Sequence, residues 1–141
     1  MDIKRINSPL TKDVIRTLKA GDEVLITGII YTARDIAHQR ICDSIAKSEQ
    51  LPLNLDGAII YFVGPSPARE PRAIGSAGPT TSSRMDSFSP ILLDNGLAAM
   101  IGRGIDANYL EILCRRIQEF ILRLLAEREL CLVKQLSLQK L

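Results

Sequence analysis

The chain has 141 residues, of which 46% are hydrophobic and 24% charged, and its formal net charge is +2. This length fits one domain with a core large enough to fold alone. Aromatic residues make up only 4% and are not interleaved with blocks of lysine and arginine. The composition therefore argues against nucleic acid and anionic membrane surfaces as partners.

The sequence shows no targeting or membrane signal. No apolar segment follows the charges at the N-terminus, as a secretory signal would require, and no apolar run approaches the roughly 20 residues that span a bilayer. The three cysteines, Cys42, Cys114 and Cys131, lie too far apart for the C-x-x-C spacing of metal sites. Their odd number fits no closed disulfide framework. We therefore expect a cytoplasmic protein that holds no metal ion of its own.

The first elements predicted along the chain are a short helix and a strand. Thr11 is a candidate N-cap for a helix over residues 13–20, because threonine accepts hydrogen bonds from the first helical turn. The β-branched run over 23–30 predicts one buried strand. Gly28 inside this run indicates a bulge or a close approach of backbone.

The middle of the chain predicts a second helix, a second strand and a third helix. Residues 32–47 have one apolar stripe at helical spacing, made of Ala33, Ile36, Ala37, Ile41, Ile45 and Ala46. Residues 58–63 predict a buried strand. Residues 64–79 are rich in Pro, Gly, Ser and Ala and predict a loop whose length suggests a function. Residues 80–95 predict a third helix, broken near Pro90.

The C-terminal third predicts a short strand over residues 97–101, followed by one long amphipathic helix over 106–141, which contains no Gly or Pro. The order of elements predicts an α/β fold with a single layer-type domain. We place this domain at residues 1–104 and an atypical C-terminal helix at 105–141.

The entry to the third predicted helix is the best candidate for a binding site. A helix N-terminus presents unpaired N–H groups and a partial positive charge, which suit a carboxylate or phosphate. Arg84 lies one helical turn beyond Thr80, so the guanidinium and the hydroxyl can face one ligand. The alternative is a simple helix cap followed by a solvated arginine, because short motifs of this kind often carry no function.

Arg34 is the second candidate, because it follows a predicted strand at the start of a helix, where ligands tend to bind in α/β sheets. The alternative is a surface arginine paired with Asp35 or Asp2. His38, the only histidine, lies one turn beyond Arg34 and could act as a base or a donor. A histidine on the helix surface with a structural hydrogen bond is the simpler interpretation.

Six stretches, in this order and spacing, resemble the β-subunit or C-terminal domain of class I fumarases and L-tartrate dehydratases. They are residues 21–28, 31–38, 53–58, 61–65, 74–86 and 100–104, including Gly-Pro-Thr-Thr-Ser-Ser-Arg-Met-Asp at 78–86. The resemblance implies a swivelling β/β/α domain that closes over a partner. That partner is an α-subunit which carries a 4Fe–4S cluster on its own cysteines, so the expected assembly is a hetero-oligomer that is inactive without it.

The resemblance also implies a function and site residues. The expected reaction is the reversible hydration or dehydration of a C4 dicarboxylate, either fumarate to malate or tartrate to oxaloacetate. Arg34 and Arg84 are expected to bind the substrate carboxylates, for which the planar guanidinium is suited. Thr80 matches the proposed catalytic base, and the open iron of the cluster would act as a Lewis acid on the leaving hydroxyl. Arg103 stands where the family usually has a lysine. Because arginine keeps the positive charge, a contact with a substrate carboxylate stays possible.

Beyond Gly104 the chain departs from the family, because the Leu-, Arg- and Glu-rich segment replaces the expected helix, strand and glycine-rich end. A truncated or frame-shifted C-terminus would look like this. Two alternatives therefore stand beside the hydro-lyase subunit: a non-catalytic remnant that binds a partner or an anion, and a stand-alone anion-binding module.

Overall fold

The computed structural model describes residues 3–19, 22–71, 74–103 and 120–123. Its parallel strands form a two-stranded sheet, β1-β2, and a four-stranded sheet, β3-β4-β5-β6. In chain order the elements are β1 (Lys4–Asn7), α1 (Lys12–Arg16), β2 (Val24–Thr27), β3 (Tyr31–Thr32), α2 (Asp35–Ala46), β4 (Ile59–Tyr61), the 3₁₀ helix η1 (Ser82–Met85), α3 (Ser89–Asp94), β5 (Ala99–Gly102) and β6 (Phe120–Arg123).

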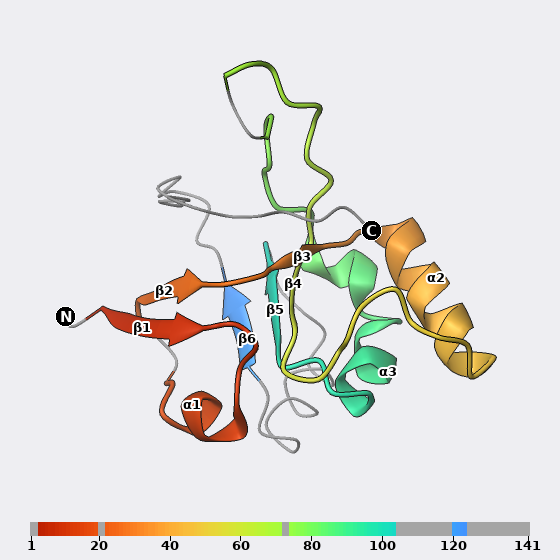
Figure 1. Ribbon diagram of the computed structural model, residues 1–141, viewed down its shortest axis with the longest axis horizontal. Helices are drawn as coiled ribbons and strands as arrows, with labels where there is room; N and C mark the ends of the chain where they lie inside the picture. Colours follow the sequence, from red (N-terminus) through yellow and green to blue (C-terminus); the bar gives the residue numbers. More distant parts are fainter. Residues whose placement is uncertain (1–2, 20–21, 72–73, 104–119, 124–141) are drawn as a thin grey trace.

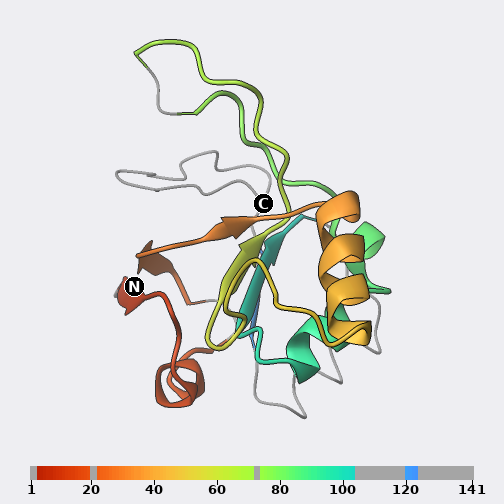
Figure 2. The same ribbon diagram turned by 45° about the vertical axis from the view of Figure 1, so that its right-hand side comes forward.

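The larger sheet lies between two other layers (Figures 1 and 2). Side chains alternate between the faces of a strand, so β4 and β5 contribute to two separate cores. Ile60 and Met100 belong to the core that includes residues of α2 and α3. Ile59 and Ala99 belong to the core formed with β1 and α1. This arrangement confirms the predicted α/β class, while the swivelling motion stays a prediction.

The strand predicted over residues 23–30 is present in shortened form as β2, which is partly buried rather than buried, and the next strand, β3, begins just beyond residue 30. β2 pairs with β1, whereas β3 pairs with β4. Gly28 separates them with a φ of +115°, in the region that glycine adopts without a steric penalty. A Cβ atom at this position would lie 2.5 Å from the carbonyl oxygen of Ser8. The predicted close approach of backbone is therefore confirmed.

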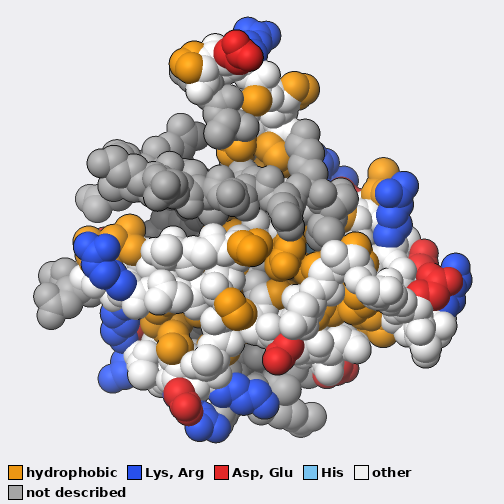
Figure 3. Space-filling model, in the orientation of Figure 1, with side chains coloured by type: hydrophobic (Ala, Val, Ile, Leu, Met, Phe, Trp, Pro, Cys, Tyr) orange, Lys and Arg blue, Asp and Glu red, His pale blue; other side chains and the backbone are white. Residues whose placement is uncertain are grey.

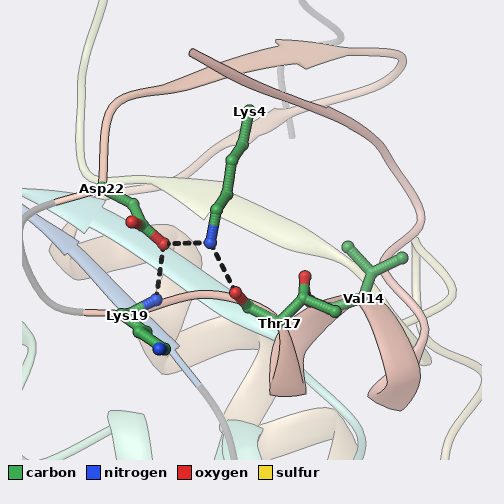
Figure 4. Close-up of polar contacts among 5 residues, drawn as sticks. All are labelled: Lys4, Val14, Thr17, Lys19 and Asp22. Carbon is green, nitrogen blue, oxygen red and sulfur yellow. Dashed lines mark hydrogen bonds and ion pairs between the residues drawn. The ribbon is translucent and has the colours of Figure 1, made fainter. Parts of the chain in front are cut away.

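The helix predicted over 13–20 is present in shortened form as α1, and the Thr11 side chain accepts a hydrogen bond from the Val14 N–H at 3.4 Å. A polar network fastens the end of this region to β1 (Figure 4). Lys4 Nζ donates to Asp22 Oδ2 and to the Thr17 carbonyl, each at 2.6 Å. The Lys19 N–H donates to the same carboxylate oxygen at 2.7 Å. These cationic and N–H partners hold the pKa of Asp22 below its ordinary value.

The amphipathic helix predicted over 32–47 is confirmed as α2, which packs Ile41 and Cys42 into the core. Two residues of the predicted stripe do not follow it: Ile36, in the first turn, is 70% exposed, and Ala46, the last residue of the helix, is exposed as well. None of the described helices is long and apolar enough to cross a membrane.

An arm projects from the body of the molecule (green-yellow at the top of Figures 1 and 2). Its described part comprises residues 64–71 and 74–79. Hydrogen bonds close its base. The Ser66 N–H donates to the Ser76 carbonyl at 2.9 Å, and the Ser76 N–H donates to Ser66 Oγ at 2.8 Å. The Tyr61 hydroxyl donates to the Ala77 carbonyl at 2.7 Å. The predicted loop is thus present, with its two ends held side by side.

The third predicted helix, over residues 80–95, is wrong as one element. The structure has the single 3₁₀ turn η1, a turn over residues 86–88, and then α3 with Pro90 in its first turn. Proline is well accepted at the start of a helix because it lacks an N–H that would be unpaired there. The predicted break near Pro90 is therefore a helix start.

The strand predicted over 97–101 is confirmed as β5, which covers slightly later residues. The long C-terminal helix is wrong at residues 120–123, which form β6, parallel to β5. The rest of the predicted helix lies outside the described residues. The domain boundary at residue 104 stays a prediction.

Gly28→Ala should destabilise the protein by about 1–3 kcal/mol, because alanine at a positive φ is strained and its Cβ would meet the Ser8 backbone. Urea denaturation measures the change. Gly78→Ala is the matched control, since a Cβ at Gly78 meets nothing within 4 Å. Equal losses of stability in the two variants would contradict the role assigned to Gly28.

Candidate functional site

Three neighbouring strands end at the same edge of the larger sheet, because β3, β4 and β5 are parallel and adjacent. The candidate residues follow these ends. Arg34 comes shortly after β3, and Arg103 directly after β5. The Thr80 N–H donates to the carbonyl of Phe62, just beyond β4, at 2.6 Å. Parallel pairing therefore gathers residues that are far apart in the sequence, at the edge where ligands bind in α/β folds.

Arg34 is the N-cap residue of α2, and its own side chain makes no capping hydrogen bond. Its carbonyl accepts two bonds from His38, one from the backbone N–H at 2.9 Å and one from Nδ1 at 3.0 Å. Its side chain lies against Gly64, where a Cβ would stand 2.9 Å from Arg34 Cδ. The backbone and the side chain of Arg34 are thus both held by neighbouring residues.

Asp35 connects the two predicted carboxylate-binding arginines. Its Oδ1 lies 2.9 Å from Arg84 Nη2, and its Oδ2 lies 3.8 Å from Arg34 Nε. The arginine side chains are 44% and 52% exposed. The sequence predicted both arginines, and it offered Asp35 only as a surface partner of Arg34. The contact with Arg84 was missed, because nothing in the sequence brings residues 35 and 84 together.

Thr80 and Arg103 are joined through the backbone. The Arg103 N–H approaches the Thr80 carbonyl at 3.4 Å, and the Ser82 N–H donates to the Arg103 carbonyl at 2.8 Å. Thr80 therefore lies in an extended segment, and the prediction that it occupies the first turn of a helix is wrong. Arg84 does not lie one α-helical turn beyond it, because η1 begins only at Ser82. The short 3₁₀ turn replaces the predicted anion-binding helix entry.

His38 is buried with no exposed surface, so its predicted place on the helix surface is wrong, while its predicted structural hydrogen bond is confirmed. The imidazole stands edge-on to Phe62, with ring centroids 5.2 Å apart, and 5.9 Å from the Phe88 ring. A carbonyl can only accept, so the contact with Arg34 assigns the proton to Nδ1. Nε2 is then a buried acceptor without a hydrogen-bond partner in the described part of the chain. Burial lowers the pKa of His38, against the Arg34 carbonyl and the Asp35 charge, which raise it.

No group of three or more His, Cys, Asp or Glu side chains in the described ranges could hold a metal ion. Cys42 is a free cysteine in the core, where burial raises the pKa of its thiol. Cys114 and Cys131 lie outside the described residues. The donor set needed for an iron–sulfur cluster is therefore not offered by the part of the chain that the structure covers.

The side chains of Arg34 and Arg84 are each about half exposed. Two hollows in the described structure lie elsewhere: one is within the arm, beside Ser66 and Gly75, and the other is between β1 and α1. On the face seen in Figure 3, Lys and Arg side chains lie in separate groups. A ligand on the two arginines would thus be covered only in part by this chain.

The sequence profile of a family described as Fumarase C-terminus matches residues 2–124. "Putative L(+)-tartrate dehydratase subunit beta" of Methanocaldococcus jannaschii is 41% identical over 99 residues, a match that covers 67% of this chain and 50% of the relative. L(+)-tartrate dehydratase subunit beta of Escherichia coli K12 is 30% identical over 104 residues, covering 72% and 50%. Fumarate hydratase 2 of Leishmania major is 36% identical over 98 residues, covering 68% and 17%. The chain thus spans about half the length of the β-subunit relatives.

The His38 environment predicts a pH-dependent stability. The unfolded chain protonates His38 near pH 6.5, whereas the folded chain keeps it neutral to a lower pH. Between these two pKa values the unfolded state binds the extra proton, so the free energy of unfolding decreases as the pH falls, by at most about 1.4 kcal/mol per pH unit. His38→Asn, which can still donate to the Arg34 carbonyl but does not titrate, should lose this slope. Urea denaturation between pH 7.5 and 5.5 tests it, and equal slopes for both proteins would contradict it.

Proposed function

This chain belongs to the Fumarase C-terminus family, and we propose that it supplies the carboxylate-binding half of a hydro-lyase active site for a C4 dicarboxylate. The observation that carries the proposal is the pair of guanidinium groups, Arg34 and Arg84, held on one carboxylate at the edge where the Thr80 segment is also anchored. The names of the relatives, tartrate dehydratase β-subunits and a fumarate hydratase, support the same class of reaction.

Charge and geometry suit a dicarboxylate. A guanidinium offers five N–H donors in a planar fork, which matches the two oxygens of a carboxylate. The contacts with Asp35 occupy one nitrogen of Arg84 and one of Arg34, so donors remain on both side chains. Arg103 follows the neighbouring strand and would supply a cation for the second carboxylate. Binding in this way would fix the substrate against the Thr80 segment.

In the proposal, Thr80 removes the proton next to a carboxylate, as the family resemblance implies. A hydroxyl is a poor base unless its alkoxide is stabilised. The N–H groups of a helix entry, which we expected to contribute, are not available, because η1 starts two residues later. The positive charges of the arginines at this sheet edge would therefore be the main stabilising groups within this chain. Hydrogen bonds on both sides of Thr80 hold its backbone in place.

The 4Fe–4S cluster and the rest of the site belong, in the proposal, to a partner α-subunit. The described residues of this chain do not form a cluster-binding set, and two relatives are named as β-subunits. The β-subunit names support a hetero-oligomer in which this chain binds and orients substrate. Fumarate and tartrate remain equal candidates, since two arginines and a threonine accept either.

Co-expression with a cluster-bearing α-subunit should give a complex that hydrates fumarate or dehydrates tartrate under anaerobic conditions. Arg84→Ala removes a charged donor and should lower kcat/KM roughly 10- to 100-fold. Thr80→Val keeps the shape but removes the hydroxyl, so kcat should fall about 10²- to 10⁴-fold. Arg16→Ala, which changes an exposed side chain of α1, is the control and should change neither constant.

A loaded complex without turnover on either substrate would overturn the hydro-lyase proposal. If such a complex, or the chain by itself, still bound dicarboxylate through Arg34 and Arg84, the non-catalytic anion-binding alternative would be supported instead. Loss of binding in Arg84→Ala distinguishes that outcome from adsorption elsewhere on the protein.

Gly64→Ala should impair substrate binding without harming the fold. The added Cβ would lie 2.9 Å from Cδ and 3.1 Å from Nη1 of Arg34, so the flexible arginine side chain must move while the backbone stays in place. We expect stability to change by less than about 0.5 kcal/mol and KM to rise between about 10- and 100-fold. Arg16→Ala on α1 is the control. An unchanged KM would show that the position of Arg34 against Gly64 does not matter for binding.

A further inference from the structure

We propose that Asp35 is a positioning residue, which holds the guanidinium groups of Arg34 and Arg84 together as a receptor for one substrate carboxylate. This inference rests on the proposed function, which assigns the two arginines to substrate. It adds a residue that makes no contact with substrate itself and acts through both arginines. Its basis is the position of one carboxylate between two cationic side chains from separate elements.

The two arginines come from different parts of the fold. Arg34 precedes α2, and Arg84 lies in η1. Two like charges brought to one place repel each other, and both side chains are about half exposed, so side-chain entropy also favours their separation. Asp35 opposes both effects, since its two oxygens take one guanidinium each, at 2.9 Å and 3.8 Å.

Asp35 is itself well placed for this task. It is the first residue of α2, where a negative charge is favoured by the helix dipole. The preceding carbonyl is fixed by the two hydrogen bonds from His38, which is fully buried. The backbone that carries the Asp35 carboxylate is therefore held in position by the core, and the two guanidinium groups bind to this fixed carboxylate.

The charges also fit one carboxylate. Arg34 and Arg84 carry two positive charges, and Asp35 carries one negative charge, so the group retains one positive charge. A single substrate carboxylate would neutralise it. The second carboxylate of the substrate would then need another cation, a position that Arg103 at the end of the neighbouring strand β5 can fill.

The opposite role for Asp35 would be that of a competing counter-ion, which the substrate must displace from Arg84. The two roles predict opposite effects of Asp35→Asn on affinity. Removal of a positioning residue weakens binding because the arginines lose their common anchor. Removal of a competitor strengthens binding because a rival anion is gone.

Asp35→Asn, Asp35→Glu and the control Asp13→Asn test the proposal. Asp13 is also an acidic residue in the first turn of a helix and also pairs with an arginine, Arg16, but it lies in α1. In the complex with an α-subunit, Asp35→Asn should raise KM roughly tenfold and change kcat less than about twofold, which is a loss of about 1.4 kcal/mol in binding. Asp35→Glu should restore part of the affinity, and Asp13→Asn should leave both constants unchanged.

A second measurement uses the full chain without a partner. Hydrogen exchange of the guanidinium N–H groups can be followed by ¹⁵N NMR. In the wild type it should be slower at Arg34 and Arg84 than in a free, solvated arginine. Exchange at these two residues should become faster in Asp35→Asn but not in Asp13→Asn. Succinate, an unreactive C4 dicarboxylate, should perturb the same signals and should bind less tightly to Asp35→Asn.

The outcomes separate the two proposals. A complex without turnover, whose arginine signals still depend on Asp35 and still respond to succinate, would overturn the hydro-lyase function and keep the positioning role. Turnover in the complex together with an unchanged or lowered KM in Asp35→Asn would overturn the positioning role and keep the function. Arginine exchange that is the same in wild type and Asp35→Asn would also overturn the positioning role.

Discussion

The parallel pairing of β3, β4 and β5 is the constraint on which the rest of the structure depends. The central strands of this larger sheet are buried on both faces. Residues of α2 and α3 cover one face, and residues of β1 and α1 cover the other. A sheet whose two faces are covered leaves the ends of its strands for polar chemistry, and ligands of α/β folds bind at the carboxyl ends. Arg34 and Arg103 lie there because the chain leaves the sheet close to these residues, and Thr80 is held there by its backbone contacts with Phe62 and Arg103.

Much of this arrangement could be predicted from the sequence, because the signals were local. The helical spacing of apolar residues predicted α2, and the buried apolar runs predicted β4 and β5. Arg34 was identified from its place after a strand and before a helix, and Arg84 from its place after a Gly- and Pro-rich loop. The family resemblance, confirmed by the profile match, added Arg103 and the assignment of a role to Thr80.

The errors arose where tertiary contacts override local preference. Residues 80 and 81 were predicted to open a helix, yet the Thr80 N–H and carbonyl pair with Phe62 and Arg103, so these two residues are extended and η1 begins only at Ser82. The run 23–30 is continuous in sequence, but it forms a strand only over 24–27, because the chain turns at Gly28; β3, just beyond the run, joins the other sheet. The Asp35–Arg84 contact joins residues that are far apart in the chain. Periodicity in a sequence concerns residues of one helix or strand and says nothing about contacts between separate elements. The Asp35–Arg84 contact could therefore be found only from the folded structure.

The closed base of the arm separates the geometry of Thr80 from whatever lies at the arm's far end. The bonds between Ser66 and Ser76, and between Tyr61 and Ala77, hold the outgoing and returning backbone together before the chain reaches Thr80. Changes in length at the tip therefore alter only a loop whose ends are already fixed, and the entropic cost of lengthening such a loop grows slowly. The tip is consequently the natural place to attach a probe or an affinity tag while the residues at the sheet edge keep their positions.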